Sequence, residues 1–283
     1  MPERIALVTG ATSGIGTETA LGLARAGFRV GLVGRDADRT GRAAARIREA
    51  VPGAVIDGFV ADLASQAEIR RLAAAVRERY PRLHVLVNNA GAIFDRHATT
   101  VDGIERTWAL DHLAYLQLSL ELLDLLKAAA PARIVSVAST AHRRGRIAFG
   151  DIGHARDYSA ITAYSQAKLG NVLFSAALAR RLAGSGVTSN ALHPGVIASG
   201  FASGTGGWFG FGWRLIRPFL SKPEDGARTS IHLATSPEVE GVTGLYFDRC
   251  KPVAPSSRGR DEALQERVWA LSLTQLGLTE PVR

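Results

Sequence analysis

A single cysteine, Cys250, among 283 residues excludes an internal disulfide and a metal site built from several cysteines. No apolar run reaches the roughly 18–20 residues that a membrane-spanning helix needs. The first residues, MPERIALVTG, lead straight into a strand-like run and lack the pattern of a secretory signal. From these absences we expect a cytoplasmic, soluble protein without a transmembrane segment and without a bound metal.

Positive charge is abundant but is not clustered. The formal net charge is +8, yet the arginines are spread along helix-like stretches such as RTGRAAARIREA at 39–50. Nucleic-acid binding usually requires a compact basic patch with stacking aromatics, and the nearest candidate, RRGR at 143–146, is short. We therefore expect no nucleic-acid partner, although the positive field suits an anionic cofactor. The many Ala, Gly and Arg residues suggest a bacterial source.

Strand-like runs alternate along the chain with longer helix-like runs. The expected strands are 5–10, 29–34, 55–62, 84–91, 133–139, 188–195 and 244–248. The expected helices are 14–26, 36–50, 65–79, 100–129, 160–183 and 223–235. This alternation predicts an α/β fold with a doubly wound, parallel, seven-stranded sheet and helices on both faces. No linker divides the chain, so we expect one domain over residues 1–283, with a docked helical tail at 260–278.

Two long connections, 140–159 and 196–222, interrupt the alternation. Both follow the carboxyl ends of strands, where open α/β sheets bind ligands. The second is rich in glycine and aromatics, which predicts a lid over a large apolar ligand. Its expected substrate contacts are Phe201, Trp208 and Trp213. The alternatives are a hydrophobic helix packed on the body of the protein and peripheral contact with a membrane.

Three glycines, Gly10, Gly14 and Gly16, stand at the turn from the first strand into an Ala-rich helix. Gly10 permits a tight turn, Gly14 permits close backbone approach to a pyrophosphate, and Gly16 lets the helix pack on the strand. The helix N-terminus would then offer free N–H groups to the anion. The pattern predicts a dinucleotide site; a tight turn without a ligand is the alternative.

The second strand ends in Gly34 and Arg35, where an acid would bind the 2′-hydroxyl of an adenosine ribose. A guanidinium there favours a 2′-phosphate, so we expect NADP(H) in preference to NAD. A solvent-facing arginine without a ligand is the alternative. Further cofactor contacts are expected after later strands. Asp62 and Leu63 would contact the adenine, and Asn89, Ala90 and Gly91 would lie beside the cofactor. The nicotinamide carboxamide would be contacted by Pro194, Gly195, Ile197 and Ser199.

Tyr164 and Lys168 are separated by one helical turn and share a helix face. A tyrosine ordinarily has a pKa near 10, and a nearby ammonium lowers this pKa by stabilising the phenolate. Such a pair suits proton exchange with a carbonyl or alcohol oxygen while a hydride moves to or from a nicotinamide. Ser139, at the end of the fifth strand, can donate to the same substrate oxygen.

The motifs TGATSGIG, Asp62-Leu63, NNAG, the serine of VAS, YSQAK and HPG, in this order and spacing, resemble the short-chain dehydrogenase/reductase family. The resemblance covers about residues 4–250 and implies a Rossmann-type fold with strand order 3-2-1-4-5-6-7. It implies that Tyr164 is the acid/base, that Lys168 lowers the pKa of this tyrosine and binds the ribose, and that Ser139 contacts the substrate oxygen. It also implies cofactor contacts from Thr12, Ser13 and Ile15.

KLGNVLFSAALARRL, GVTSNALHPGVI and YFDRCKP are similar to the retinol-dehydrogenase-like branch of that family. The implied function is that of an NADPH-dependent ketoreductase or dehydrogenase acting on a bulky lipophilic carbonyl or alcohol. The alternatives keep bound NADP but assign non-redox chemistry or a catalytically impaired sensor. Family members often form homo-oligomers, which we expect here; a monomer is the alternative, because 140–159 and the tail could cover the shared faces.

Asp111 departs from the family pattern, which usually has Asn at this place. It lies on an otherwise apolar helical stripe with Trp108 and Tyr115, and a buried charge needs a partner. The resemblance implies that the family's Asn holds a proton-relay water near the lysine, largely through its main-chain carbonyl. Our hypothesis is that Asp111 is ionised and faces Lys168 through water, which would stabilise the ammonium and raise the pKa of Tyr164. Impaired relay is the alternative.

Overall fold

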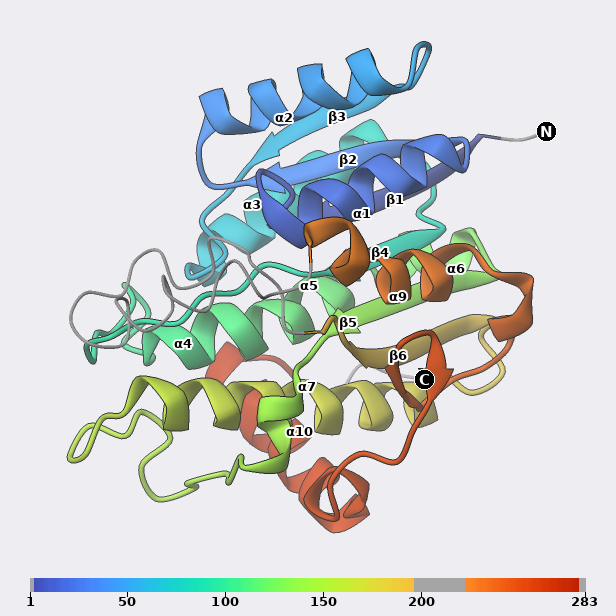
Figure 1. The fold of residues 1–283 in the computed structure, drawn as a ribbon. Helices are drawn as coiled ribbons and strands as arrows, with labels where there is room; N and C mark the ends of the chain where they lie inside the picture. The colour runs from blue at the N-terminus through green and yellow to red at the C-terminus, as the bar shows by residue number, and fades with distance from the viewer. Residues whose placement is uncertain (1–2, 196–221, 280–283) are drawn as a thin grey trace.

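The computed structural model describes residues 3–195 and 222–279, which build an eight-stranded sheet in the order β3-β2-β1-β4-β5-β6-β7-β8 (Figure 1). The strands are β1 Arg4–Thr9, β2 Phe28–Gly34, β3 Ile56–Val60, β4 Val85–Asn88, β5 Ala132–Val137, β6 Val187–His193, β7 Tyr246–Asp248 and β8 Lys251–Pro252. All neighbouring strands are parallel except β8, which pairs antiparallel with β7. The expected Rossmann-type order is confirmed, and β8 extends it by a short hairpin.

Helices cover both faces of the sheet (Figure 1). One face carries α1 Gly14–Arg25, α2 Ala37–Ala50 and α9 Pro223–Thr235. The other carries α3 Gln66–Arg79, α5 Ala114–Glu121, α6 Leu123–Ala128 and α7 Ala160–Arg181, with α10 Glu262–Leu276 packed against α7. Each layer buries its own apolar core against the sheet, as a doubly wound fold requires.

Local sequence signals set several helix boundaries. Asp36 begins α2 by accepting a hydrogen bond from the main-chain N of Arg39 at 2.8 Å. Asp261 begins α10 by accepting from the main-chain N of Leu264 at 3.0 Å, and Gly277, at φ +62°, ends that helix. These are a side-chain N-cap and a left-handed glycine C-cap.

The expectation of one continuous helix over 100–129 was wrong. The chain instead forms α4 Arg106–Trp108, a π-helical turn η1 Ala109–Leu113, then α5 and α6. Glu105 caps the start by accepting hydrogen bonds from the main-chain N atoms of Thr107 and Trp108, both at 2.8 Å. A π-turn inserts one extra residue into a helix, and apolar spacing alone does not reveal it.

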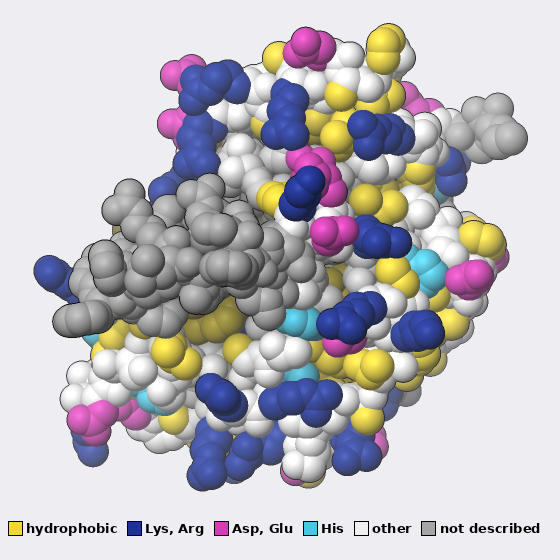
Figure 2. Space-filling model, viewed as in Figure 1, with side chains coloured by type: hydrophobic (Ala, Val, Ile, Leu, Met, Phe, Trp, Pro, Cys, Tyr) yellow, Lys and Arg dark blue, Asp and Glu magenta, His cyan; other side chains and the backbone are white. Residues whose placement is uncertain are grey.

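The surface is consistent with the dispersed charge of the sequence. On the face drawn in Figure 2, Lys and Arg side chains are spread among acidic and uncharged ones. Within residues 3–195 and 222–279, no helix is both long and apolar enough to cross a membrane. The same part of the chain contains no group of three or more His, Cys, Asp or Glu side chains placed to hold a metal ion.

Short 3₁₀ turns complete the connections between these elements. They are η2 Thr140–Arg143, η5 Pro237–Val239 and η6 Arg258–Arg260. Ser139 begins η2 directly after β5, with its hydroxyl accepting from the main-chain N of Ala141 at 3.2 Å. The end of β5 is therefore fixed in a defined turn at the sheet edge where ligands bind in open α/β folds.

Candidate active site

The turn between β1 and α1 is shaped to admit a backbone-bound anion. Gly10 and Gly14 have φ of +64° and +58°, a region that favours glycine. A Cβ at Gly16 would lie 2.3 Å from the carbonyl oxygen of Gly10, so no larger residue fits there. Ser13 makes no side-chain cap hydrogen bond to α1, which leaves the N–H groups of this helix start available to a ligand.

Thr9 joins this turn to the loop after β4. Its hydroxyl accepts hydrogen bonds from the main-chain N atoms of Asn89, at 2.9 Å, and Ala90, at 3.0 Å. The side-chain Nδ2 of Asn89 donates to the carbonyl of Thr9 at 2.8 Å. Sequence reasoning found the asparagine but missed Thr9, whose role depends on the pairing of β1 with β4.

The end of β2 cannot carry an acid. A Cβ at Gly34 would lie 2.3 Å from the Oγ1 of Thr40 and 2.4 Å from the Cγ2 of Thr12, so a carboxylate side chain has no room. The next residue, Arg35, is exposed. The geometry therefore leaves no room for a carboxylate at residue 34 and leaves Arg35 exposed directly after the strand.

The other expected cofactor residues are distributed along the same sheet edge. Asp62 is exposed, with its Oδ1 accepting from the main-chain N of Ala64 at 3.0 Å, while Leu63 is buried. Pro194 and Gly195 follow β6 and are half-buried. The remaining expected residues lie outside the described part of the chain: Ile197, Ser199, Phe201, Trp208 and Trp213.

Ser139, Tyr164 and Lys168 come together between β5 and α7. The Ser139 side chain hydrogen-bonds that of Tyr164. The Nζ of Lys168 lies 5.4 Å from the centre of the Tyr164 ring and donates to the carbonyl of Val137 at 3.2 Å. Both Ser139 and Tyr164 are partly buried, whereas Lys168 is buried.

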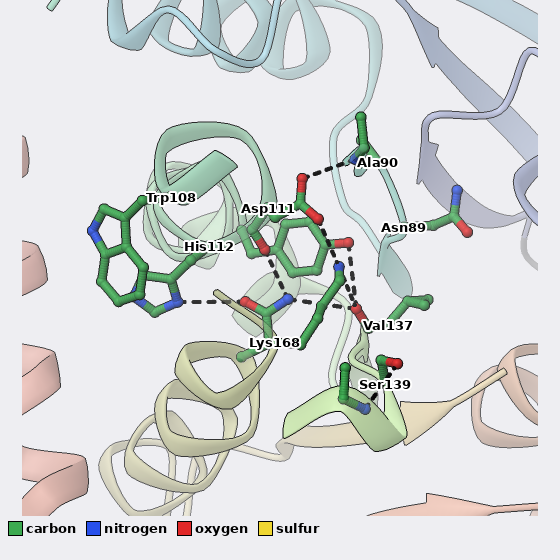
Figure 3. A network of polar contacts seen from close by, with 12 residues as sticks. Asn89, Ala90, Trp108, Asp111, His112, Val137, Ser139 and Lys168 are labelled. Carbon is green, nitrogen blue, oxygen red and sulfur yellow. Dashed lines mark hydrogen bonds and ion pairs between the residues drawn. The ribbon is translucent and has the colours of Figure 1, made fainter. Parts of the chain in front are cut away.

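Asp111 contacts Lys168 directly, which corrects the expectation of an intervening water (Figure 3). Its Oδ2 lies 3.2 Å from the Nζ of Lys168, and its side chain is 0% exposed. The distance makes this contact an ion pair, and within residues 3–195 and 222–279 no donor is aligned for a hydrogen bond to Oδ2. The Oδ1 accepts from the main-chain N of Ala92 at 2.9 Å. A Cβ at Gly91 would lie 2.8 Å from Oδ2, so glycine is needed beside the pair.

The electrostatics of the site oppose ionisation of the tyrosine. Burial raises the pKa of Tyr164 above its usual range, the charge of Asp111 raises it further, and the hydrogen bond from Ser139 lowers it. Burial also raises the pKa of Asp111, against the opposing effect of Lys168. Tyr164 is therefore held as a neutral phenol, the form that can donate a proton.

Two histidines that sequence reasoning missed hold the segment after β5. The Nδ1 of buried His142 lies 2.6 Å from the carbonyl oxygen of Ser139, and its Nε2 accepts from the main-chain N of Ser256 at 3.1 Å. His142 therefore donates through Nδ1. The Nδ1 of His193, at the end of β6, accepts from the main-chain N of Thr140 at 3.3 Å. His193 belongs to the HPG motif, but neither contact could be predicted from the sequence, because both depend on the tertiary fold.

Known proteins share both this sequence and this fold. Residues 4–206 match the family model described as short chain dehydrogenase. Retinol dehydrogenase 12 of Mus musculus is 38% identical over 278 residues, covering 98% of this chain and 88% of that protein. The crystal structure of an uncharacterized protein from Mycobacterium paratuberculosis has a TM-score of 0.80 and 31% identity, covering 99% of this chain and 95% of that one. The Pseudomonas aeruginosa RhlG/NADP active-site complex has a TM-score of 0.68 and 29% identity, covering 86% of this chain and 93% of that one.

The family match, the near-full-length relative and the confirmed strand order agree with one another. The chain belongs to the short-chain dehydrogenase family, in which its sequence is similar to the retinol-dehydrogenase branch.

Proposed function

We propose that this protein is an NADP(H)-dependent oxidoreductase that transfers hydride between the nicotinamide and the carbonyl or alcohol carbon of a bulky lipophilic substrate. The observation that carries the proposal is the meeting of Ser139, Tyr164 and Lys168 at the carboxyl end of the sheet, beside the glycine turn. Family membership supplies the coarser statement, an oxidoreductase acting on alcohol and carbonyl groups.

The residues fit a nicotinamide dinucleotide. Gly10 and Gly16 have no room for a side chain, α1 begins without a side-chain cap, and Gly34 excludes a carboxylate near the expected ribose. Arg35 is exposed at that place and suits a 2′-phosphate. The relative solved with NADP supports the same preference. When bound, the nicotinamide would supply or accept the hydride.

The side chains of this site handle the proton. For carbonyl reduction, Ser139 and Tyr164 would bind the substrate oxygen, and Tyr164 would donate its phenolic proton as the oxygen gains charge. For alcohol oxidation, the phenolate would take the proton back. Lys168 would stabilise that phenolate, with Asp111 reducing its effect.

The substrate class rests on the retinol dehydrogenase relative and on the aromatic segment 196–222. A long, apolar aldehyde or ketone and its alcohol are the expected substrates. Retinal, decanal and an aromatic ketone are suitable probes because they differ in length and flatness but share a reducible carbonyl.

The test is NADPH consumption by the purified protein with these carbonyls, followed through the absorbance of the reduced nicotinamide. We expect turnover with NADPH well above that with NADH, and loss of turnover in Tyr164→Phe with NADPH binding retained. The matched control is Tyr158→Phe, because the Tyr158 hydroxyl bonds Phe94 and Thr107. Absence of turnover across the panel would contradict the proposal.

One observation favours a second candidate, an NADP-binding sensor with an impaired site. The direct Asp111–Lys168 contact weakens the cation that should lower the pKa of Tyr164. A sensor would bind NADPH tightly in calorimetry and yet show no turnover in the wild type. Recovery of turnover in Asp111→Asn would then identify the carboxylate as the cause.

A further inference from the structure

We propose that the C-terminal helix α10 positions the catalytic centre: Ser272 and Gln275 hold the π-turn η1, and thereby hold Asp111 against Lys168. Both are positioning residues, since neither touches the reacting groups. The inference rests on the proposed function, because it concerns the same Tyr164–Lys168 pair. It goes beyond that function by assigning a catalytic task to a helix that lies outside the matched family segment at 4–206.

The π-turn receives its first support from α7. The side-chain Nδ2 of Asn171 donates to the main-chain carbonyl of Asp111 at 2.7 Å. Both residues are fully buried. π-turns are rare, usually occur at functional sites, and need tertiary contacts to persist. Because Asn171 already bonds this carbonyl, the carboxylate is the group through which Asp111 acts on Lys168.

The π-turn receives its second support from α10, through His112. The Nε2 of His112 lies 2.9 Å from the Oγ of Ser272, and its Nδ1 lies 3.4 Å from the Oδ1 of Asn171. His112 and Ser272 are both 0% exposed. A Cβ at Gly170 would lie 2.7 Å from the Nδ1 of His112, so the ring is closely enclosed. His112 is the neighbour of Asp111, and fixing one residue restrains the other.

Trp108, one residue before the π-turn, makes the third contact. Its Nε1 donates to the Oε1 of Gln275 at 2.8 Å. Its ring lies beside that of His112, with centroids 4.2 Å apart and the ring planes tilted by 37° (Figure 3). Trp108 is also 0% exposed. Residues before and within the π-turn are therefore each bonded to α10. The bond between His112 and Ser272 is buried, and the bond between Trp108 and Gln275 is partly buried.

This support carries no charge of its own. Burial lowers the pKa of His112 to about 3, so the imidazole is neutral at physiological pH. A neutral imidazole has a single N–H. His112 therefore donates either from Nε2 to the Oγ of Ser272, whose hydroxyl then donates to the carbonyl of Val268, or from Nδ1 to the Oδ1 of Asn171. The ionisable groups that do face the Asp111–Lys168 pair are Tyr115, Tyr164 and Glu105, with Tyr246 acting on Tyr164. None of them lies on α10.

The test measures Ser272→Ala, Gln275→Leu and the double variant that combines them, each against the control variant Thr274→Ala. Thr274 is the matched control because it lies on α10, is exposed, and its hydroxyl donates to the carbonyl of Ala270 in its own helix. We expect kcat at a fixed pH to change about tenfold or more in the combined variant, with little change in KM. We also expect its pH–rate profile to shift in the direction of Asp111→Asn, by about half a pH unit or more.

A double-variant comparison separates positioning from general stability. In the Asp111→Asn background, the tail substitutions Ser272→Ala and Gln275→Leu should cause no further shift of the pH profile. The carboxylate that Ser272 and Gln275 position is absent from that background. A fall in melting temperature with an unmoved profile would overturn the proposal. So would a shift of equal size in both backgrounds. Either single substitution gives the same comparison if the combined variant does not fold.

Amide exchange supplies a reading that needs neither cofactor nor substrate. The main-chain N of Ala92 donates to the Oδ1 of Asp111, so its exchange reports the place of the carboxylate. We expect faster exchange at Ala92 in the tail variants and no change in Thr274→Ala. Unchanged exchange in every variant would refute the positioning role. Lack of turnover in the wild type would refute only the proposed function.

Discussion

Replacing Asp111 by Asn tests whether this carboxylate sets the pH at which Tyr164 works. The substitution keeps the size of the side chain and an oxygen that can accept from the main-chain N of Ala92, but it removes the negative charge. The Lys168 ammonium keeps its hydrogen bond to the Val137 carbonyl and its contacts with the Tyr115 and Tyr164 rings. The main change is therefore electrostatic.

The size of the effect follows from the geometry. The Nζ of Lys168 lies 3.2 Å from the Oδ2 of Asp111 and 5.4 Å from the centre of the Tyr164 ring. A charge roughly 8 Å from the phenol, at an effective dielectric constant of about 20, changes its ionisation free energy by about 2 kcal/mol. This corresponds to about 1.5 pH units. Because a negative charge is removed, the pKa of Tyr164 should fall.

The assay is the pH dependence of kcat/KM in both directions, since oxidation needs the phenolate and reduction needs the phenol. In Asp111→Asn, the rising limb of alcohol oxidation and the falling limb of carbonyl reduction should both move to lower pH. Glu18→Gln is the control, because it also removes a largely buried carboxylate. Glu18 lies on α1 and pairs with Arg46 of α2 at 2.7 Å. An unmoved profile, or a shift to higher pH, would refute the reasoning.

Three further predictions concern the cofactor site and the fold. Arg35→Ala should raise KM for NADPH by about tenfold or more and leave KM for NADH nearly unchanged, measured by initial rates. Gly16→Ala should abolish NADPH binding in calorimetry, because its Cβ would lie 2.3 Å from the carbonyl oxygen of Gly10. The pKa of Asp57 is lowered to about 2, since hydrogen bonds led by Arg29 outweigh the burial that raises it. The stabilisation by ionised Asp57 is fully present above the ordinary pKa of Asp and is lost as pH falls from about 4 through 2. Asp57→Asn should therefore lower the free energy of unfolding by about 2 kcal/mol at neutral pH. In urea unfolding at a series of pH values, the variant should lose less stability than the wild type between about pH 4 and 2.

The sequence predicts the fold because its signals are local and repeated. Apolar strands alternate with longer helical runs, and the glycine turn lies between the first strand and the first helix. The two-residue β8 was not predicted, because so short a strand exists only through its pairing with β7. The break in the helix over 100–129 was also missed, since apolar residues keep nearly helical spacing through the π-turn.

The site was only partly predictable, for a different reason. Tyr164 and Lys168 share one helix, so their spacing reveals the pair. Thr9, His142 and Asn171 act through partners far away in sequence, and their residue types are common in structural roles. For Asp111, sequence reasoning found the partner but not the contact, because the distance between two helices is a tertiary property.

The direct ion pair with Asp111 changes the relative contributions of Lys168 and Ser139 to the pKa of Tyr164. A lone ammonium beside Tyr164 would act as a full positive charge, whereas an ammonium paired at 3.2 Å acts as a dipole whose effect decreases faster with distance. The hydrogen bond from Ser139 lowers the pKa of Tyr164 and is not neutralised in this way. On the proposed mechanism, with Asp111 ionised, Ser139 would carry a larger share of the stabilisation of the phenolate than it would beside an unpaired lysine. His142 donates to the Ser139 carbonyl and Asn171 donates to the Asp111 carbonyl, so each of the two opposing influences on Tyr164 has its own buried support.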